Sequence, residues 1–162
     1  MIATARLEGS DRWLGDKNAS TLIALAAPPY TVWKSTKSHV TRLDGPALFS
    51  YNGKTYAVGR HNPDPPGFFA YFGSILARKR TALYRVLGDR LVYLSDLPSA
   101  GDTSYAGVVL HDGHAYISYY TSDTARDYPW IIGMLARSDI MIAKIELPLL
   151  ERLAESKLAA DR

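Results

Sequence analysis

Residues 101–120 of this 162-residue chain read GDTSYAGVVLHDGHAYISYY, and this stretch decides the fold class. An apolar run at residues 108–110 precedes an Asp-Gly turn, and a β-branched and aromatic run follows at residues 115–120. Two such runs around an Asp-Gly pair are typical of an antiparallel β-hairpin. The polar residues 101–105 form a loop of the kind that carries a site on a rigid scaffold. Taken alone, the pattern favours an ordinary hairpin of an all-β domain with a polar turn.

The same plan recurs 60 residues earlier in the chain. Residues 44–60 read DGPALFSYNGKTYAVGR, with a polar entry, an apolar run, an Asn-Gly turn and a second strand. Adding 60 to the residue number places Gly53 on Gly113, Tyr56 on Tyr116 and Arg60 on Tyr120. Another apolar strand follows each hairpin, at residues 82–87 and 140–147. A hairpin-plus-strand unit repeated at this spacing is typical of the blades of a β-propeller.

We therefore predict an all-β fold, a partial β-propeller of about three four-stranded antiparallel blades with the terminal ones incomplete, and a C-terminal helix. The blades occupy about residues 1–40, 41–100 and 101–147, and the helix occupies residues 148–162. The expected strands are residues 2–7, 21–27, 30–34, 47–51, 55–60, 81–87, 90–95, 106–110, 115–120 and 140–147. Apolar side chains recur at helical spacing after Pro148, which predicts an amphipathic helix that starts at this proline.

The composition excludes several classes of site and partner. The chain has no cysteine, which excludes disulfides, thiolate metal sites and a cysteine nucleophile. The four histidines lack a spacing that seats a metal, so we expect no metal and no cofactor. The net charge of +3 is spread along the chain, which predicts no nucleic-acid binding. The only tight basic cluster, residues 78–80, is expected to be a solvated turn.

The N-terminus bears on localisation. It is charged by position 6 and lacks the apolar core of a signal peptide. No apolar run approaches the roughly 20 residues that span a bilayer. The sequence therefore predicts no membrane partner and, by default, a cytoplasmic location.

Polar residues recur at matching positions of the repeated units. Arg6 and Arg60 lie at strand ends, Asp44 lies at a hairpin entry, and Asp102 precedes the equivalent entry by two residues. In a propeller these positions meet around the central axis, where arginines would bind a carboxylate or phosphate through bidentate hydrogen bonds. Nearby aspartates would serve as general acid or base. Taken singly, each arginine is more typical of a salt bridge at a blade edge.

The motifs DGPALF, KTYAVGR, LPSAGDTSYAGVVLHDGHAYISYYTS and IMIAKIEL resemble the sialidase-like (BNR-repeat) β-propellers, particularly their last two blades. The resemblance covers about residues 44–147. It implies an exo-acting glycosidase in which arginines hold the substrate carboxylate, a tyrosine assisted by a glutamate is the nucleophile, and an aspartate is the acid/base catalyst. On this chain the catalytic candidates are Asp102, Tyr105 and Asp44. The substrate-binding candidates are Arg6, Arg60, His61, Tyr119 and Tyr120, and the only nearby glutamate is Glu8.

Two functional hypotheses follow. The first is a sialidase-like glycoside hydrolase, or a partial version of one, that acts on or binds a carbohydrate. The second is a non-catalytic carbohydrate-binding or assembly module, half of a propeller completed by dimerisation. Three blades leave two apolar faces open, so we expect a homodimer that closes the ring. In the competing solution, the C-terminal helix covers one open face and loops such as residues 62–74 cover the other.

Overall fold

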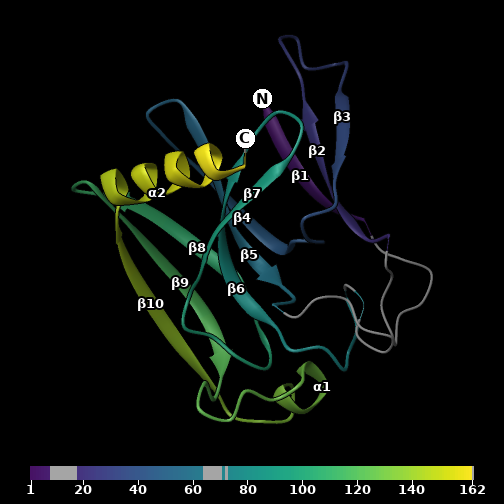
Figure 1. Ribbon diagram of the computed structural model, residues 1–162, viewed down its shortest axis with the longest axis vertical. Helices are drawn as coiled ribbons and strands as arrows, with labels where there is room; N and C mark the ends of the chain where they lie inside the picture. Colours follow the sequence, from purple (N-terminus) through teal and green to yellow (C-terminus); the bar gives the residue numbers. More distant parts are fainter. Residues whose placement is uncertain (8–17, 64–70, 72, 162) are drawn as a thin grey trace.

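The computed structural model describes residues 1–7, 18–63, 71 and 73–161. Its strands form three antiparallel sheets, which follow one another in chain order (Figure 1). The first sheet contains β1 (Ile2–Leu7), β2 (Ser20–Leu25) and β3 (Lys34–Ser38). The second contains β4 (Asp44–Tyr51), β5 (Lys54–His61), β6 (Arg80–Val86) and β7 (Leu91–Asp96). The third contains β8 (Thr103–His111), β9 (His114–Ser122) and β10 (Ser138–Glu146), with β9 in the middle.

Two helices complete the described structure. Helix α1 (Trp130–Gly133) is a single turn between β9 and β10, and α2 (Leu147–Ala160) is the C-terminal helix. The prediction of a β-rich fold with a C-terminal helix is confirmed. The three sheets do not close into a ring. Neither described helix is long and apolar enough to cross a membrane.

The 60-residue repeat is visible in the backbone of the two hairpins. The β4–β5 ladder shifts register between Asp44 and Ala47, and the β8–β9 ladder shifts between Ser104 and Gly107. Inside these bulges Gly45 and Tyr105 both have positive φ angles, of 56° and 51°. The tips of the two hairpins match as well, with φ near 47° at Asn52 and Asp112. A bulge is a local feature of strand pairing, so its recurrence marks the hairpins as copies of one unit.

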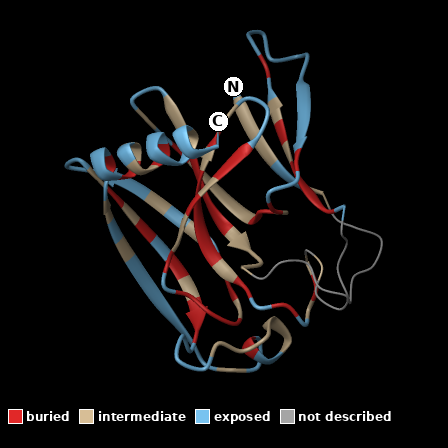
Figure 2. Cartoon of the chain, viewed as in Figure 1, coloured by how far each residue is buried: buried red, intermediate tan, exposed pale blue. Residues whose placement is uncertain are grey.

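The second sheet is covered on both faces. One face, with Tyr56, Val58 and Leu83, packs against Ile117 and Tyr119 of β9 and against α2. The other face, with Ala57, Tyr84 and Val86, packs against Ile23 of β2 and Leu43. Successive residues of a strand point to opposite faces, which is why neighbours on β5 belong to different clusters. Buried residues concentrate in this sheet and in β9, whereas β10 is exposed along most of its length (Figure 2).

One predicted strand, at residues 30–34, is wrong. The amide of Tyr30 donates to the carbonyl of Ala27 in a tight turn, and Tyr30 has a φ of 66°. Residues 31–33 belong to no ladder, and the strand β3 begins only at Lys34. Tyr30 and Val32 therefore belong to the connection between β2 and β3, and of this alternation only Lys34 lies in a strand. Most of the expected polar loop at residues 8–20, and most of the loop at residues 62–74, lies outside the described residues.

Helix α2 begins where the proline predicts and lies on the rim between the second and third sheets. Its buried residues Leu147, Leu150 and Ala154 belong to the larger core cluster, next to residues of β7 and β9. Two hairpin residues of the second sheet, Asn52 and Lys54, contact its carboxylates from outside. The apolar side of this helix therefore fills the rim of the core, and the helix does not lie on an outer sheet face as the competing solution expects. The loop that this solution places over the other face, residues 62–74, lies mostly outside the described residues.

Candidate functional site

The ends of several strands gather at one end of the sheets. Strand β1 ends just after Arg6 and β5 just after Arg60, while β4 begins at Asp44. Antiparallel pairing places Arg60 directly opposite Asp44 in the second sheet and Tyr120 directly opposite Ser104 in the third. Because the start of one strand lies beside the end of its neighbour, the acidic side chain of Asp44 lies next to the basic side chain of Arg60.

Asp44 is the centre of this cluster. Its buried carboxylate accepts two hydrogen bonds of 2.6 Å from Arg42, through Nε and Nη2. Nη2 of Arg60 lies 3.3 Å from Oδ2, and Nη1 of Arg6 lies 3.8 Å from Oδ1. Burial alone would raise the pKa of Asp44, but the three guanidinium groups, Arg42 above all, lower it below its usual value. Asp44 is therefore a fixed, ionised acceptor.

Asp102 forms the second half of the cluster. Its Oδ1 accepts from Nη1 of Arg60 at 3.2 Å and from the indole Nε1 of Trp130 at 2.6 Å. Its Oδ2 accepts from the hydroxyl of Tyr120 at 3.1 Å. The guanidinium of Arg60 also lies over the Trp130 ring, 5.3 Å from its centroid. Arg60 thus bridges Asp44 of the second sheet and Asp102 at the entry of the third.

The phenol of Tyr120 is held protonated by this arrangement. Burial, and then the adjacent Asp102 carboxylate, raise its pKa to about 12. The ring of Tyr105 stacks on the ring of Tyr120, with centroids 6.3 Å apart and planes inclined by 26°. Tyr105 itself is exposed, and its ring lies beside Gly45 at the entry of β4. The cluster therefore has a flat aromatic surface at its edge.

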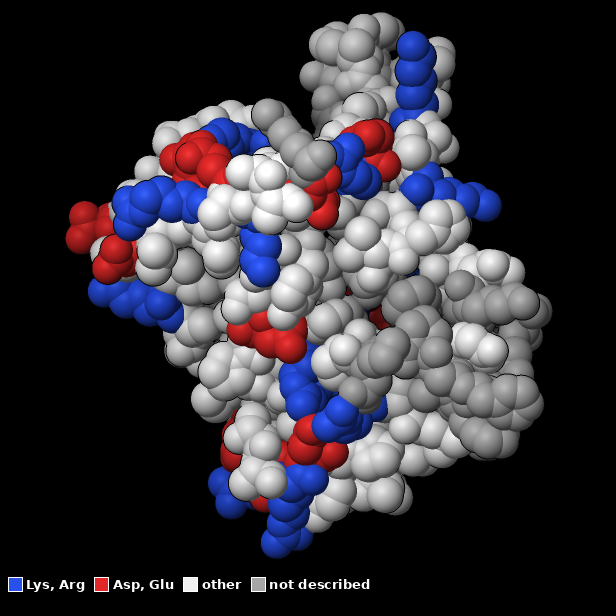
Figure 3. All heavy atoms as spheres, in the orientation of Figure 1, with Lys and Arg blue, Asp and Glu red and all other residues white. Residues whose placement is uncertain are grey.

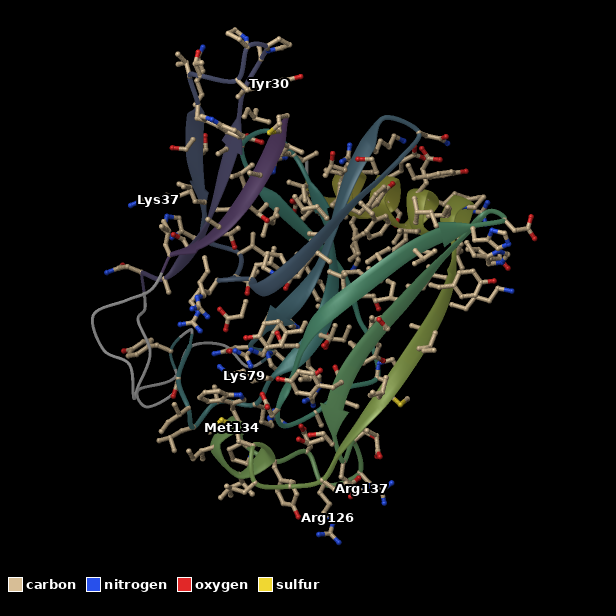
Figure 4. The ribbon with its side chains drawn as sticks, turned by 180° about the vertical axis from the view of Figure 1, so that it is seen from behind. Tyr30, Lys37, Lys79, Arg126, Met134 and Arg137 are labelled. Carbon is tan, nitrogen blue, oxygen red and sulfur yellow. The ribbon has the colours of Figure 1, made fainter. Side chains whose placement is uncertain are left out.

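Lys79 contradicts the expectation of a solvated basic turn. Its side chain is only 2% exposed, and Nζ donates to Oδ1 of Asn62 at 2.6 Å. Burial lowers the pKa of Lys79 to about 7, an effect that Asp44 opposes and the nearby Arg60 and Arg42 reinforce. Figure 4 shows Lys79 in the middle of the molecule, far from the labelled basic residues at its two ends.

The neighbouring Arg78 and Arg80 are engaged rather than only solvated. Both donate to Asp127, Arg80 through two hydrogen bonds of 2.6 and 2.7 Å. On the face drawn in Figure 3, basic and acidic side chains are interspersed. The arginine–aspartate cluster differs from this pattern, because it joins three arginines to two carboxylates, with the buried Lys79 near enough to be affected by the charge of Asp44.

Most of the predicted site residues meet in the cluster, and two do not. The structure brings together Arg6, Asp44, Arg60, Asp102, Tyr105 and Tyr120. His61 follows Arg60 on β5, so its side chain points to the opposite face. It pairs there with Asp96 at 2.7 Å and packs on Tyr84 and Tyr93, beside a cavity of about 310 Å³.

Tyr119 is separated from Tyr120 in the same way. It is buried in the core, and its hydroxyl donates to the carbonyl of Pro98 at 2.9 Å. Burial raises its pKa. Glu8 lies outside the described residues. Within the described part of the chain, no group of three His, Asp or Glu side chains is arranged to hold a metal ion.

Three residues of the cluster were not identified from the sequence. Arg42 reaches Asp44 two residues on, because Leu43 between them has a φ of 49°. Of these three residues, only Arg42 could have been suspected from the sequence, because it stands two positions before Asp44. Trp130 is the first residue of α1, 28 residues after Asp102, and Lys79 lies directly before β6, 35 residues after Asp44, so no local pattern points to either.

The comparisons with known proteins supply no relative for this cluster. No protein-family model matches the chain, and no match was found among the curated proteins or the solved structures.

Proposed function

We propose that the chain forms part of a sialidase-like β-propeller and binds a carboxylated carbohydrate at the arginine–aspartate cluster. The observation that carries the proposal is the convergence of Arg6, Arg42 and Arg60 on one buried carboxylate. With Lys79 nearby, basic groups outnumber acidic ones, which favours an added anion. The succession of three sheets with a repeated bulged hairpin supports the propeller blades.

The three arginines differ in how firmly they are held. Arg42 makes the shortest contacts, and Arg60 is shared between two aspartates. Arg6 is 42% exposed and makes the longest of the three contacts, 3.8 Å to Asp44. Because its guanidinium is the one exposed at the surface of the cluster, a ligand carboxylate would approach at Arg6 and accept a charge-assisted hydrogen bond. The exposed ring of Tyr105 would lie against an apolar face of the sugar.

Binding of acidic and neutral monosaccharides tests this proposal. Titration calorimetry with N-acetylneuraminic acid and glucuronic acid should give saturable heat, whereas galactose should give none. Arg6→Ala should weaken binding by roughly 10- to 100-fold, because a hydrogen bond to a charged group contributes about 1.5–3 kcal/mol. Lys37→Ala is the matched control, since it removes one positive charge from an exposed position on β3. Equal binding of galactose, or equal effects of the two variants, would refute the proposal.

Hydrolysis is a second candidate, favoured by the hydrogen bond of 3.1 Å between Tyr120 and Asp102. A phenol whose proton is shared with a carboxylate is the arrangement that the sialidase resemblance implies for the nucleophile. Release of methylumbelliferone from its sialic-acid glycoside tests it. Tyr120→Phe should abolish turnover and leave ligand affinity within about twofold. Binding without turnover by the unmodified chain would instead favour the non-catalytic carbohydrate-binding module.

A further inference from the structure

The outward face of the third sheet is an apolar surface with a recognisable counterpart inside the molecule. We define this open face by the residues of β8, β9 and β10 on the side away from the second sheet and outside the arginine–aspartate cluster: Gly107, Val109, His111, His114, Tyr116, Ser118, Ile140, Ile142, Lys144 and Glu146. Ile140 and Ile142 are 81% and 72% exposed. Lys144 and Glu146 are its charged members among the described residues, both at the end that leads into α2. Beyond them the face carries Val109, Ile140 and Ile142, and soluble proteins seldom expose contiguous apolar surface without a partner.

The repeat identifies the counterpart residue by residue. Tyr116, Ser118 and Tyr120 correspond to Tyr56, Val58 and Arg60 on β5. The next strands match too, because Tyr116 pairs with Lys144 and Tyr56 pairs with Arg85. In both sheets the basic side chain lies over the tyrosine ring, at 5.3 Å for Arg85 and 5.7 Å for Lys144. The two faces are therefore copies of one surface.

The copy on the second sheet is covered by another sheet. Tyr56 and Val58 are fully buried against Ala115, Ile117 and Tyr119 of β9. On the second sheet this surface packs against the face of the sheet that follows it. On the third sheet the equivalent surface is exposed to solvent. Helix α2 does not cover it, because its apolar residues fill the rim of the core.

The first sheet offers a face that suits this role. Ala3, Ala5, Leu22 and Ala24 alternate with the residues that pack on the second sheet, so they point outwards. Adding 54 to the residue number places β1 on β5, so Ala3 corresponds to Ala57. Adding a further 60 places Ala57 on Ile117, the β9 residue that packs against the second sheet. Small side chains here complement the bulky Tyr116 and Ile142 of the open face. A single chain cannot bring these faces together, because the second sheet stands between them (Figure 1).

We propose that a second copy of this chain occupies the open face through the outer face of its first sheet. Each copy offers both surfaces, so two head-to-tail contacts related by a two-fold axis close the assembly and leave neither surface free. The proposal concerns the sheet faces alone and stands or fails independently of the carbohydrate ligand.

Light scattering coupled to gel filtration tests the assembly. The unmodified chain should elute at micromolar concentration with twice its mass of 17.9 kDa. Ile142→Asp should convert it to a monomer, as should Ala5→Trp on the opposite contact surface. Val32→Asp is the matched control, since Val32 is 74% exposed but lies in the connection between β2 and β3. Circular dichroism melts should show that all four proteins are folded.

Cross-linking distinguishes the head-to-tail contact from other dimers. The chain has no cysteine, so Ala3→Cys with Ser118→Cys introduces only the two reactive positions. A short bismaleimide should link this double variant into a covalent dimer, and it should not link two chains that both carry only Ala3→Cys. A folded monomer of the unmodified chain would overturn the proposal. So would a dimer that Ala5→Trp leaves intact, or one that only Val32→Asp disrupts.

Discussion

Replacement of Asp102 by alanine would remove the carboxylate that joins the second sheet to the third. Its two oxygens accept from Arg60 at 3.2 Å, Trp130 at 2.6 Å and Tyr120 at 3.1 Å. These donors belong to β5, α1 and β9, so one side chain connects three separate elements. In Asp102→Ala the N–H groups of Arg60 and Trp130 that now bind Asp102 would lose their acceptor at a site that is largely shielded from water.

The expected loss follows from the three contacts. Each hydrogen bond to a charged group contributes about 1.5–3 kcal/mol to stability. The three share one carboxylate, and effects within such a network are not additive. Loss of one partner of a buried ion pair costs about 3–5 kcal/mol, and we expect Asp102→Ala to fall in this range. For a chain of this length each kcal/mol lowers the Tm by about 2–4 °C, which gives a decrease of roughly 6–20 °C.

Thermal and urea unfolding, followed by circular dichroism, measure this loss. Asp139→Ala is the control, because it removes an exposed aspartate that pairs with the exposed Arg137 at 3.2 Å and should cost at most about 1 kcal/mol. Asp102→Asn keeps acceptor oxygen without the charge and should fall between the two. A Tm decrease below about 2 °C for Asp102→Ala, or equal decreases for Asp102→Ala and Asp139→Ala, would show that the carboxylate does not join the sheets.

Three further predictions concern stability in urea. The pKa of Lys79 is about 7 in the folded chain, against an ordinary value of 10.5 for a lysine in the unfolded chain. The unfolded chain therefore binds more protons between these two pH values, and stability should rise with pH by up to about 1.4 kcal/mol per pH unit. Lys79→Met should flatten this rise between pH 7 and 9.5, and an unchanged slope would contradict the burial of the amine. Leu150→Ala should lower the free energy of unfolding by about 2–5 kcal/mol, whereas Leu149→Ala, at an exposed position, should change it by less than about 0.5 kcal/mol. Gly45→Ala should lower the free energy of unfolding more than Gly113→Ala. Both glycines have positive φ, but a Cβ at Gly45 would lie 2.8 Å from the hydroxyl of Ser104, whereas a Cβ at Gly113 would meet nothing within 4 Å. Equal losses of stability would mean that the serine hydroxyl moves aside.

The local architecture could be predicted from patterns in the sequence. The Asn-Gly and Asp-Gly turns, the apolar runs around them and the 60-residue spacing predict both hairpins, and Pro148 marks the start of α2. These features depend on backbone conformation and on contacts between near neighbours, so the residues involved are visible together in the sequence. The failure at residues 30–34 has the same origin, because alternation alone does not supply a partner strand.

Which side chains meet depends on how distant segments pack. Arg60 reaches Asp102 across 42 residues of chain, and the cluster gains Trp130 from α1 and Lys79 from the segment before β6, neither of which has a sequence signal. Strand alternation already separates His61 from Arg60 and Tyr119 from Tyr120, and the packing of the sheets decides which residue of each pair joins the cluster. Contacts between sheets are set by register, bulges and packing of distant segments, and these arise only when the sheets come together.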